Sequence, residues 1–152
     1  MAGELVLIDS NVLIRWVQPE GVDFQIVTGS IRSIDKLRDV PCFTSQNLGE
    51  FWNVLTRPAN RNGYGLPPEE AHVRAEKVES KFRLLQESLE VHSTWRKILV
   101  DYRVSGVQVH DARLVAATHV HGVKRILTFN TKDFERYDQI EAIHPAEMAL
   151  KG

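Results

Sequence analysis

Short apolar runs alternate along this chain with longer segments whose apolar residues recur at helical spacing. The runs predict strands rich in branched residues, at 4–8, 40–45, 89–93, 125–129 and 140–145. The intervening segments predict helices at 23–38, 46–57, 68–85, 94–104 and 110–121. Pro58 ends the second of these helices, Pro67 and Pro68 open the third, and Gly122 closes the last. This alternation predicts an α/β fold with a short parallel sheet flanked by helices, formed as a single domain over residues 1–152.

Length and composition agree with one folded domain. The chain has 152 residues, of which 43% are hydrophobic and 26% charged, as in ordinary globular proteins. Cys42 is the single cysteine, which excludes an internal disulfide framework and fits a reducing cytoplasm. No apolar run is long enough to cross a membrane, and the N-terminus lacks the pattern of a secretion signal. We therefore expect a cytoplasmic protein with no membrane association, and the net charge of −1 gives no support for nucleic-acid binding by itself.

Four acidic residues stand where an α/β sheet usually binds its ligand, outside the carboxyl ends of the strands. Asp9 follows the first predicted strand in "LIDSNVLI", and Asp133 follows a later one in "ILTFNTKDF". Asp111 and Glu50 begin apolar helix faces that should point inward. Each acid also has an ordinary structural explanation: a helix cap, a first-turn acid or a partner for Arg57.

Several carboxylates that share one pocket need a positive charge, because like charges raise each other's pKa and cost stability. Hard divalent cations such as Mg²⁺ bind carboxylate oxygens, waters and substrate phosphates. A carboxylate site that holds such ions suits in-line displacement at phosphorus.

Four motifs in order resemble those of the PIN-domain ribonucleases, and in particular the VapC-type toxins of bacterial toxin–antitoxin pairs. They are "LIDSNVLI", "NLGEFWNVLTRP", "HDARLVAA" and "ILTFNTKDF", and the resemblance runs from Leu5 to about Pro145. It implies a PIN-like fold, a Mg²⁺- or Mn²⁺-dependent endoribonuclease activity and a small protein antitoxin as partner. It also implies that the catalytic and metal-binding acids are Asp9, Glu50, Asp111 and Asp133, with Ser10 supporting them.

The chain departs from this family at Asn130, where many members carry an acid. An asparagine can coordinate through its carbonyl but brings no charge, so Asp133 becomes the fourth acid and the number of metal ions stays open. Basic residues beside the motifs could line the approach of RNA: Arg15, Arg57, Arg61, Arg113 and Lys132. Trp16, Trp52 and Trp95 lie on amphipathic helices, where core positions are expected and stacking on bases is the alternative.

Three other functions compete with this interpretation. His110, His119 and His121 could suggest zinc, but His119 and His121 are two apart on a helix, and no cysteine pair joins them. A metal-dependent phosphatase or phosphotransferase could use Asp9 as its nucleophile, although the next acid is only Glu20. A non-catalytic RNA- or protein-binding module is the third, and the presence of all four acids counts against it.

The apolar stripes of two helices suggest self-association. The stripes of Phe24–Leu37 and Ala71–Leu85 exceed what a small sheet obviously needs, and related proteins pair. We therefore expect a homodimer.

Overall fold

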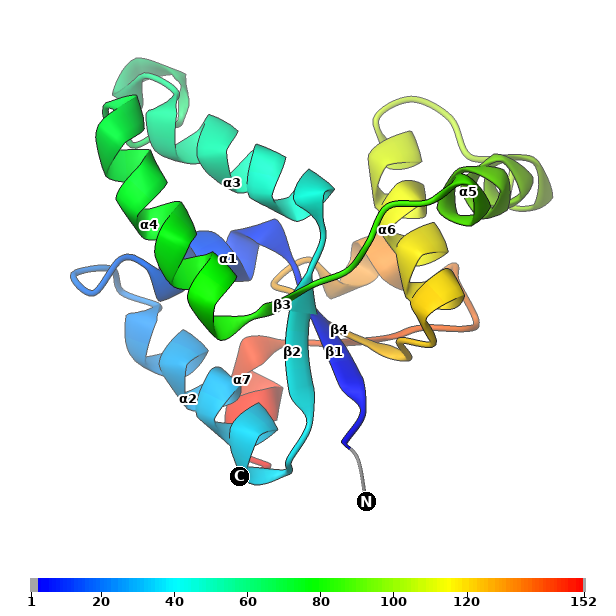
Figure 1. Cartoon of the computed structure of the whole chain (residues 1–152), viewed down its shortest axis with the longest axis horizontal. Coiled ribbons are helices and arrows are strands. Elements are labelled where there is room, and N and C mark those ends of the chain that lie inside the picture. Colours follow the sequence, from blue (N-terminus) through cyan, green and yellow to red (C-terminus); the bar gives the residue numbers. More distant parts are fainter. Residues whose placement is uncertain (1–2, 152) are drawn as a thin grey trace.

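A five-stranded parallel sheet forms the centre of the protein, whose computed structural model describes residues 3–151 (Figure 1). The strands are β1 (Leu5–Ile8), β2 (Val40–Phe43), β3 (Arg83–Leu84), β4 (Arg125–Leu127) and β5 (Glu141–Ile143). Their order in the sheet is β3-β2-β1-β4-β5, and every neighbouring pair is parallel. The predicted α/β fold with a short parallel sheet is confirmed.

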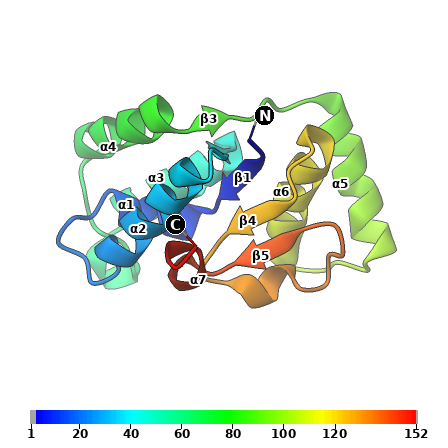
Figure 2. The same cartoon turned by 90° about the horizontal axis from the view of Figure 1, so that it is seen from below.

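Helices connect the strands and cover both faces of the sheet. They are α1 (Ser10–Trp16), α2 (Phe24–Lys36), α3 (Ser45–Thr56), α4 (Pro68–Lys81), α5 (Leu89–Asp101), α6 (Gln108–His121) and α7 (Pro145–Ala149). Two short 3₁₀ turns, η1 (Ala59–Arg61) and η2 (Thr131–Phe134), lie in the connections. Figure 2 shows α5 and α6 on one side of the sheet and α1, α2 and α7 on the other.

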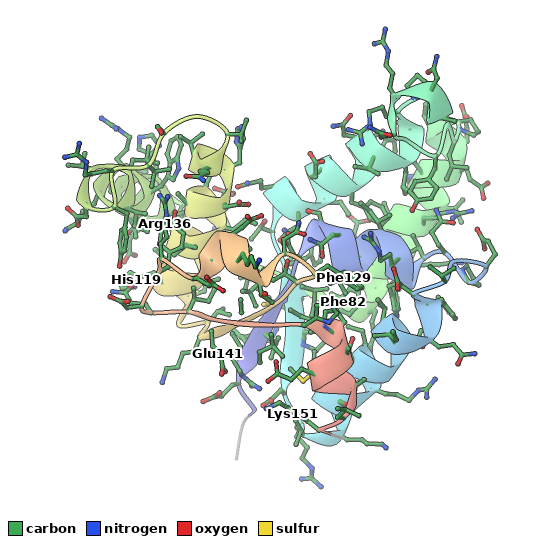
Figure 3. All side chains as sticks on the ribbon, turned by 180° about the vertical axis from the view of Figure 1, so that it is seen from behind. Phe82, His119, Phe129, Arg136, Glu141 and Lys151 are labelled. Atoms are coloured by element: carbon green, nitrogen blue, oxygen red, sulfur yellow. The ribbon has the colours of Figure 1, made fainter. Side chains whose placement is uncertain are left out.

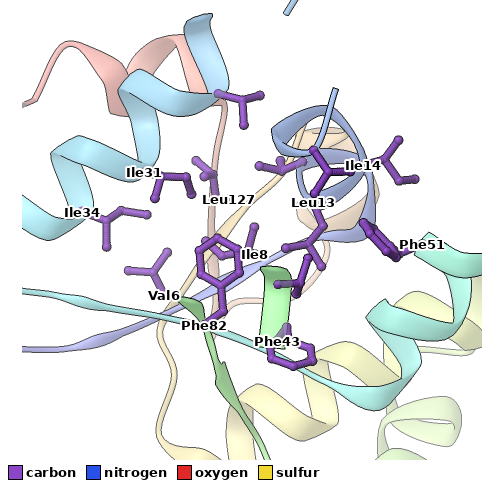
Figure 4. Close-up of a cluster of buried hydrophobic side chains, with 14 of the residues drawn as sticks. Val6, Ile8, Leu13, Ile14, Ile31, Ile34, Phe43, Phe51, Phe82 and Leu127 are labelled. Carbon is purple, nitrogen blue, oxygen red and sulfur yellow. The ribbon is translucent and has the colours of Figure 1, made fainter. Parts of the chain in front are cut away.

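The two faces of β1 contribute to two separate hydrophobic cores, because successive side chains of a strand point to opposite faces. Val6 and Ile8 pack with α1, α2, α3 and α4 in the first core, which Figure 4 shows in close-up. Leu7 packs with α5 and α6 in the second. All three side chains are fully buried. The strand is therefore apolar along its whole length up to Asp9, the first residue beyond it.

One predicted strand is wrong. Residues 89–93 form the first turns of α5 rather than a strand, and the sheet position is taken by the two-residue strand β3. The hydroxyl of Ser88 caps this helix by accepting a hydrogen bond from the backbone N–H of Val91 at 3.2 Å. Leu89 is 88% exposed, so it could not have filled a buried strand position. A short apolar run is compatible with a strand or a helix, and here the Ser88 cap favours the helix.

The apolar helix stripes from which the homodimer was predicted are largely buried in the core of the single chain. Val27, Ile31 and Ile34 of α2 are buried in the first core, as are Ala71, Ala75, Val78 and Phe82 from the α4 region. These stripes therefore give no support to a dimer, which stays a prediction. Within residues 3–151, no helix is both long and apolar enough to cross a membrane.

Candidate active site

Asp9 stands at the junction of β1 and α1, where the backbone fixes its position. Its N–H donates to the carbonyl of Leu127 at 3.0 Å, which continues the pairing of β1 with β4 past the last strand residue. Asp9 is also the N-cap residue of α1, and its Oδ1 accepts a hydrogen bond from the N–H of Ser10 at 2.8 Å. The side chain is 8% exposed. Asp9 therefore caps a helix and presents a nearly buried carboxylate at the edge of the sheet.

Thr128 holds the second oxygen of this carboxylate. Its hydroxyl donates to Asp9 Oδ2 at 2.8 Å and accepts from the side-chain amide of Asn11 at 3.2 Å and the N–H of Asn130 at 3.0 Å. The Asn11 amide also lies 3.3 Å from Asp9 Oδ2, and its carbonyl oxygen accepts from the N–H of Phe129 at 3.1 Å. This network ties the start of α1 to the segment that follows β4, so the carboxylate of Asp9 is held in one orientation.

All four predicted acids line one cavity of about 700 Å³ at the carboxyl edge of the sheet. Asp9 lies at its base, Glu50 comes from α3, Asp111 from the first turn of α6 and Asp133 from η2. In Figure 1, α3 and α6 diverge above the ends of β1 and β4, and the cavity is lined by residues of both helices. Glu50 and Asp133 are exposed, whereas Asp111 is half-buried.

Two of these carboxylates, Asp9 and Asp111, are perturbed by burial and by neighbouring negative charge. Burial raises the pKa of Asp111 from 3.8 to about 6, with the negative charges of Asp9 and Asp133 adding to the increase and His110 opposing it. Burial also raises the pKa of Asp9, against the hydrogen bonds from Thr128, Ser10 and Asn11, and Asp133 raises it further. The negative charge of Asp133 therefore disfavours ionisation of Asp9 and Asp111, and the charge of Asp9 disfavours ionisation of Asp111.

The carboxylates of the cavity fit a divalent cation that keeps several water ligands better than one that is coordinated by protein ligands alone. Among residues 3–151, no three Asp, Glu, His or Cys side chains are grouped closely enough to hold one metal ion together. Mg²⁺ usually needs only one or two direct carboxylates and completes its shell with waters and substrate phosphates. Oxygen donors with raised pKa values in an open cavity suit such an ion.

Ser10 and Asn130 both line the cavity, in different roles. The Ser10 hydroxyl donates to the backbone carbonyl of Asn47 at 3.1 Å and so joins α1 to α3 beneath the carboxylates. Asn47 in turn completes the capping box of α3 with Thr44. Asn130 is exposed and contributes its N–H to Thr128. The hydroxyl of Ser10 therefore joins two helices, whereas its backbone N–H is the group that bonds the carboxylate of Asp9.

Of the five predicted basic residues, Arg15 alone lines the cavity. Its guanidinium donates to the carbonyl of Asn11 at 2.7 Å, pairs with Asp23 at 3.2 Å and lies 4.6 Å from the centre of the Phe129 ring. Figure 3 shows Phe129 beside α1, in the segment that leads into η2. The other four are not in the cavity wall: Arg57, Arg61, Arg113 and Lys132.

Arg57 and Arg113 have structural partners instead. Arg57 donates to the carbonyl of Asn62 at 2.9 Å, and Arg113 pairs with Glu87 at 3.1 Å. Neither residue lines the cavity, and their contact with RNA stays a prediction. Their side chains were predicted to approach RNA from sequence proximity to the motifs, which says nothing of the direction in which a helical side chain points.

The three histidines are not gathered. His110 lines the carboxylate cavity, His119 lines a separate small cavity beside α5, and a ring nitrogen of His121 hydrogen-bonds the carbonyl of Gln86 at 2.8 Å. The zinc alternative therefore finds no support among the residues described.

Asn11, Thr128 and Tyr64 are parts of the site that sequence reasoning missed. Asn11 lay inside the quoted motif "LIDSNVLI" and could have been found there. Thr128 also lay inside a quoted motif, "ILTFNTKDF", but it is 119 residues away from the carboxylate that it holds. Tyr64 belongs to a loop defined only by its composition, and nothing in the sequence places it on the cavity wall.

Comparison with known proteins supports the same assignment of fold. The model of the PIN domain family matches residues 6–140. The VapBC2 structure from Rickettsia felis, bound to a DNA fragment from its promoter, aligns with a TM-score of 0.71 at 10% identity, over 92% of this chain and 98% of that one. A toxin–antitoxin complex from Klebsiella pneumoniae aligns with a TM-score of 0.64 at 18% identity, over 93% and 98% of the two chains.

A third structure has a stated activity. VapC20 of Mycobacterium tuberculosis, a toxin that cleaves the sarcin–ricin loop, aligns with a TM-score of 0.58 at 15% identity, over 80% of this chain and 86% of that one. No curated protein sequence matches the chain significantly.

Proposed function

The chain belongs to the PIN-domain family, and from this premise we propose that it is a metal-dependent endoribonuclease that hydrolyses phosphodiester bonds of RNA. One observation carries the proposal. Burial and neighbouring negative charge raise the pKa of Asp9 and of Asp111 in a single cavity, which Asp133 shares, at the sheet edge where ligands of α/β folds bind. A fold gains no stability from such crowding, so the arrangement points to a function that uses the charges.

We propose Mg²⁺ or Mn²⁺ as the ion, bound in the cavity that Asp9, Glu50, Asp111 and Asp133 line, by one or two of these carboxylates directly and by the others through water. When bound, the ion would neutralise the carboxylates, assist attack by water at phosphorus and stabilise charge on the leaving oxygen. One ion or two would satisfy this chemistry.

The chain's own residues would orient and confine the reactants. Thr128 and the N–H of Ser10 hold both oxygens of Asp9, so this carboxylate meets the substrate without losing side-chain entropy. Arg15, stacked on Phe129 and tied to Asn11, places a fixed positive charge in the wall, where it can contact an RNA phosphate. The net charge of the chain is −1, so RNA would be held by this local charge and by the metal rather than by a general basic surface.

The similar structures suggest the biological setting. The Klebsiella pneumoniae structure is a toxin–antitoxin complex, and VapC20 is an RNA-cleaving toxin. We therefore propose that this chain is the toxin of a pair that acts in the cytoplasm, with a small protein antitoxin as its partner.

Cleavage of end-labelled single-stranded RNA by the purified chain tests the proposal. We expect fragments in Mg²⁺ or Mn²⁺, none with chelator, and loss of cleavage in Asp133→Asn but not in Asp138→Asn, an exposed acid outside the cavity. A phosphatase would instead release inorganic phosphate from a phosphomonoester. A binding module would retain RNA without fragments in any metal.

A further inference from the structure

An exposed aromatic ring stands on the wall of the carboxylate cavity, although no catalytic or structural role accounts for it. Tyr64 lies in the connection between α3 and α4, and 46% of its surface is exposed. Asn62, Gly63 and Tyr64 all line the cavity that contains the four acids. Exposed aromatic rings in a ligand cavity provide a flat apolar surface that water solvates poorly.

The loop that carries this ring is fixed by hydrogen bonds on both sides. The N–H of Gly63 donates to the carbonyl of Pro58 at 3.1 Å, and the N–H of Gly65 donates to the carbonyl of Arg57 at 2.8 Å. The Arg57 guanidinium donates to the carbonyl of Asn62 at 2.9 Å. The backbone that carries the ring is thus fixed by the fold and does not depend on the substrate.

Two residues of the loop adopt shapes that few side chains allow. Asn62 has a φ of 63°, in the left-handed region that asparagine tolerates better than most residues. A Cβ added at Gly63 would lie 1.9 Å from the carbonyl oxygen of Arg57, so the loop can close only with glycine there. These two constrained residues, Asn62 and Gly63, directly precede Tyr64 in the chain.

Val54, whose carbonyl accepts a hydrogen bond from the backbone of Tyr64, lies on the same face of α3 as Glu50. The N–H of Tyr64 donates to the carbonyl of Val54 at 3.0 Å, and Val54 and Glu50 both line the cavity. Residues four apart on a helix share a face and are separated by about 6 Å along its axis. The backbone of Tyr64 is therefore held about one helical turn beyond a predicted catalytic acid.

The other large aromatic residues near the site are occupied. Trp16 packs against Phe82 with ring centres 4.8 Å apart, Trp52 packs on the first core, and Phe129 is covered by Arg15 at 4.6 Å. Among residues 3–151, Tyr64 is the only Phe, Tyr or Trp that lines the cavity. Tyr64 can therefore stack on a base, the role that was considered above for the tryptophans.

We propose that Tyr64 stacks on an unpaired nucleobase of RNA whose phosphate lies among the carboxylates, and so selects single-stranded segments as substrate. The inference rests on the proposed nuclease function. Proteins that recognise single-stranded RNA use aromatic side chains as platforms for splayed bases. The polar side chains of Asn62 and Asn130 line the same cavity and are available to the edge of such a base. A paired base in a helix could not reach the ring.

Steady-state cleavage of single-stranded RNA by three Tyr64 variants tests this. Loss of one base-stacking ring costs about 5- to 150-fold in binding, so Tyr64→Ala and Tyr64→Leu should raise KM by that factor with little change in kcat. Leucine keeps apolar bulk without an aromatic face. Tyr64→Phe should recover most of the lost affinity, because stacking needs the ring and not the hydroxyl. Leu89→Ala, at an exposed apolar position on α5 outside the cavity, is the control and should leave KM unchanged.

A second measurement removes catalysis from the test. In the Asp133→Asn background, which should not cleave RNA, and with Mg²⁺ present, RNA carrying 2-aminopurine should show fluorescence quenching on binding to the chain with Tyr64 or with Tyr64→Phe, but much less with Tyr64→Leu. Equal KM and equal quenching for Tyr64→Leu and wild type would overturn the inference while leaving the nuclease proposal intact. Wild-type RNA kinetics in Tyr64→Ala combined with a changed sedimentation coefficient would also overturn it and would assign the ring to a contact between protein chains. Absence of any metal-dependent cleavage by the wild-type chain would overturn both proposals together.

Discussion

Replacing Asp111 by asparagine should stabilise the metal-free protein, and only above mildly acidic pH. Burial and the charges of Asp9 and Asp133 raise the pKa of Asp111 from 3.8 to about 6, so the folded state disfavours its ionised form. Asparagine has nearly the same shape and no charge. The substitution therefore removes the electrostatic cost and leaves the packing of α6 largely unchanged.

The size and pH range of the effect follow from linkage. A pKa difference of about 2.2, from 3.8 to about 6, corresponds to about 3 kcal/mol at about 1.4 kcal/mol for each pKa unit. Asp111 is only half-buried, so solvent screening reduces this to about 1–1.5 kcal/mol. Below the unfolded pKa of 3.8 the group is protonated in both states and costs nothing. The cost grows as pH rises from there and is complete above about 6.

Urea unfolding with chelator, at about pH 4.5 and about pH 7.5, measures the difference between wild type and Asp111→Asn. We expect the variant to be more stable by about 1–1.5 kcal/mol at the higher pH and by much less at the lower one. Asp138→Asn, an exposed acid outside the cavity, should show no comparable dependence. Saturating Mg²⁺ should stabilise the wild type more than the variant, because binding to the folded state alone adds stability. A variant that is equally or less stable than wild type at both pH values would refute the argument that the acids repel each other.

The hydroxyl of Thr128 and the absence of a side chain at Gly63 give two further predictions. Thr128→Val removes the donor to Asp9 Oδ2 and leaves buried polar groups unpaired, so urea unfolding should show a loss of about 1–3 kcal/mol, and RNA cleavage should slow. Thr128→Ser keeps the hydroxyl and should lose much less; equal losses would contradict the role of the hydrogen bond. Gly63→Ala forces the loop away from the Arg57 carbonyl and should destabilise by about 1–3 kcal/mol. Gly49→Ala, in the interior of α3 with no atom within 4 Å of the added Cβ, should instead stabilise by about 0.5–1 kcal/mol in the same assay.

Periodicity predicted most elements that bury their own apolar residues, although it missed the short helix α1, which buries Val12, Leu13 and Ile14. Strand β1 and helix α2 could be located because their core residues repeat at the spacing of a strand or a helix. The assignment of 89–93 failed because a short apolar run does not distinguish a strand from the first turn of a capped helix. Helix α7, five residues long, was too short to show a period at all.

The acidic residues of the site could be predicted from the sequence, but the residues that orient them by hydrogen bonds could not. Strand ends and helix starts pointed to Asp9 and Asp111, since topology brings these places to one edge of the sheet. Thr128 could not be inferred, because its hydrogen bond to Asp9 depends on the register between β1 and β4. The direction of the Arg113 side chain could not be inferred for a similar reason: only the packing of α6 shows that it turns toward Glu87.

Cleavage of single-stranded RNA by Asp9→Asn, in Mg²⁺ or Mn²⁺ and again with chelator, tests the central claim most directly. Asparagine is about as good an N-cap as aspartate, so the cap of α1 should survive and urea unfolding with chelator should show a cooperatively folded variant. Even residues that only support metal ligands cost about 10- to 100-fold when lost, so we predict that removing this carboxylate lowers metal-dependent cleavage by at least about 100-fold in a folded protein. Normal metal-dependent cleavage by folded Asp9→Asn would contradict the account, because the best-ordered carboxylate of the cavity would then have no part in the reaction.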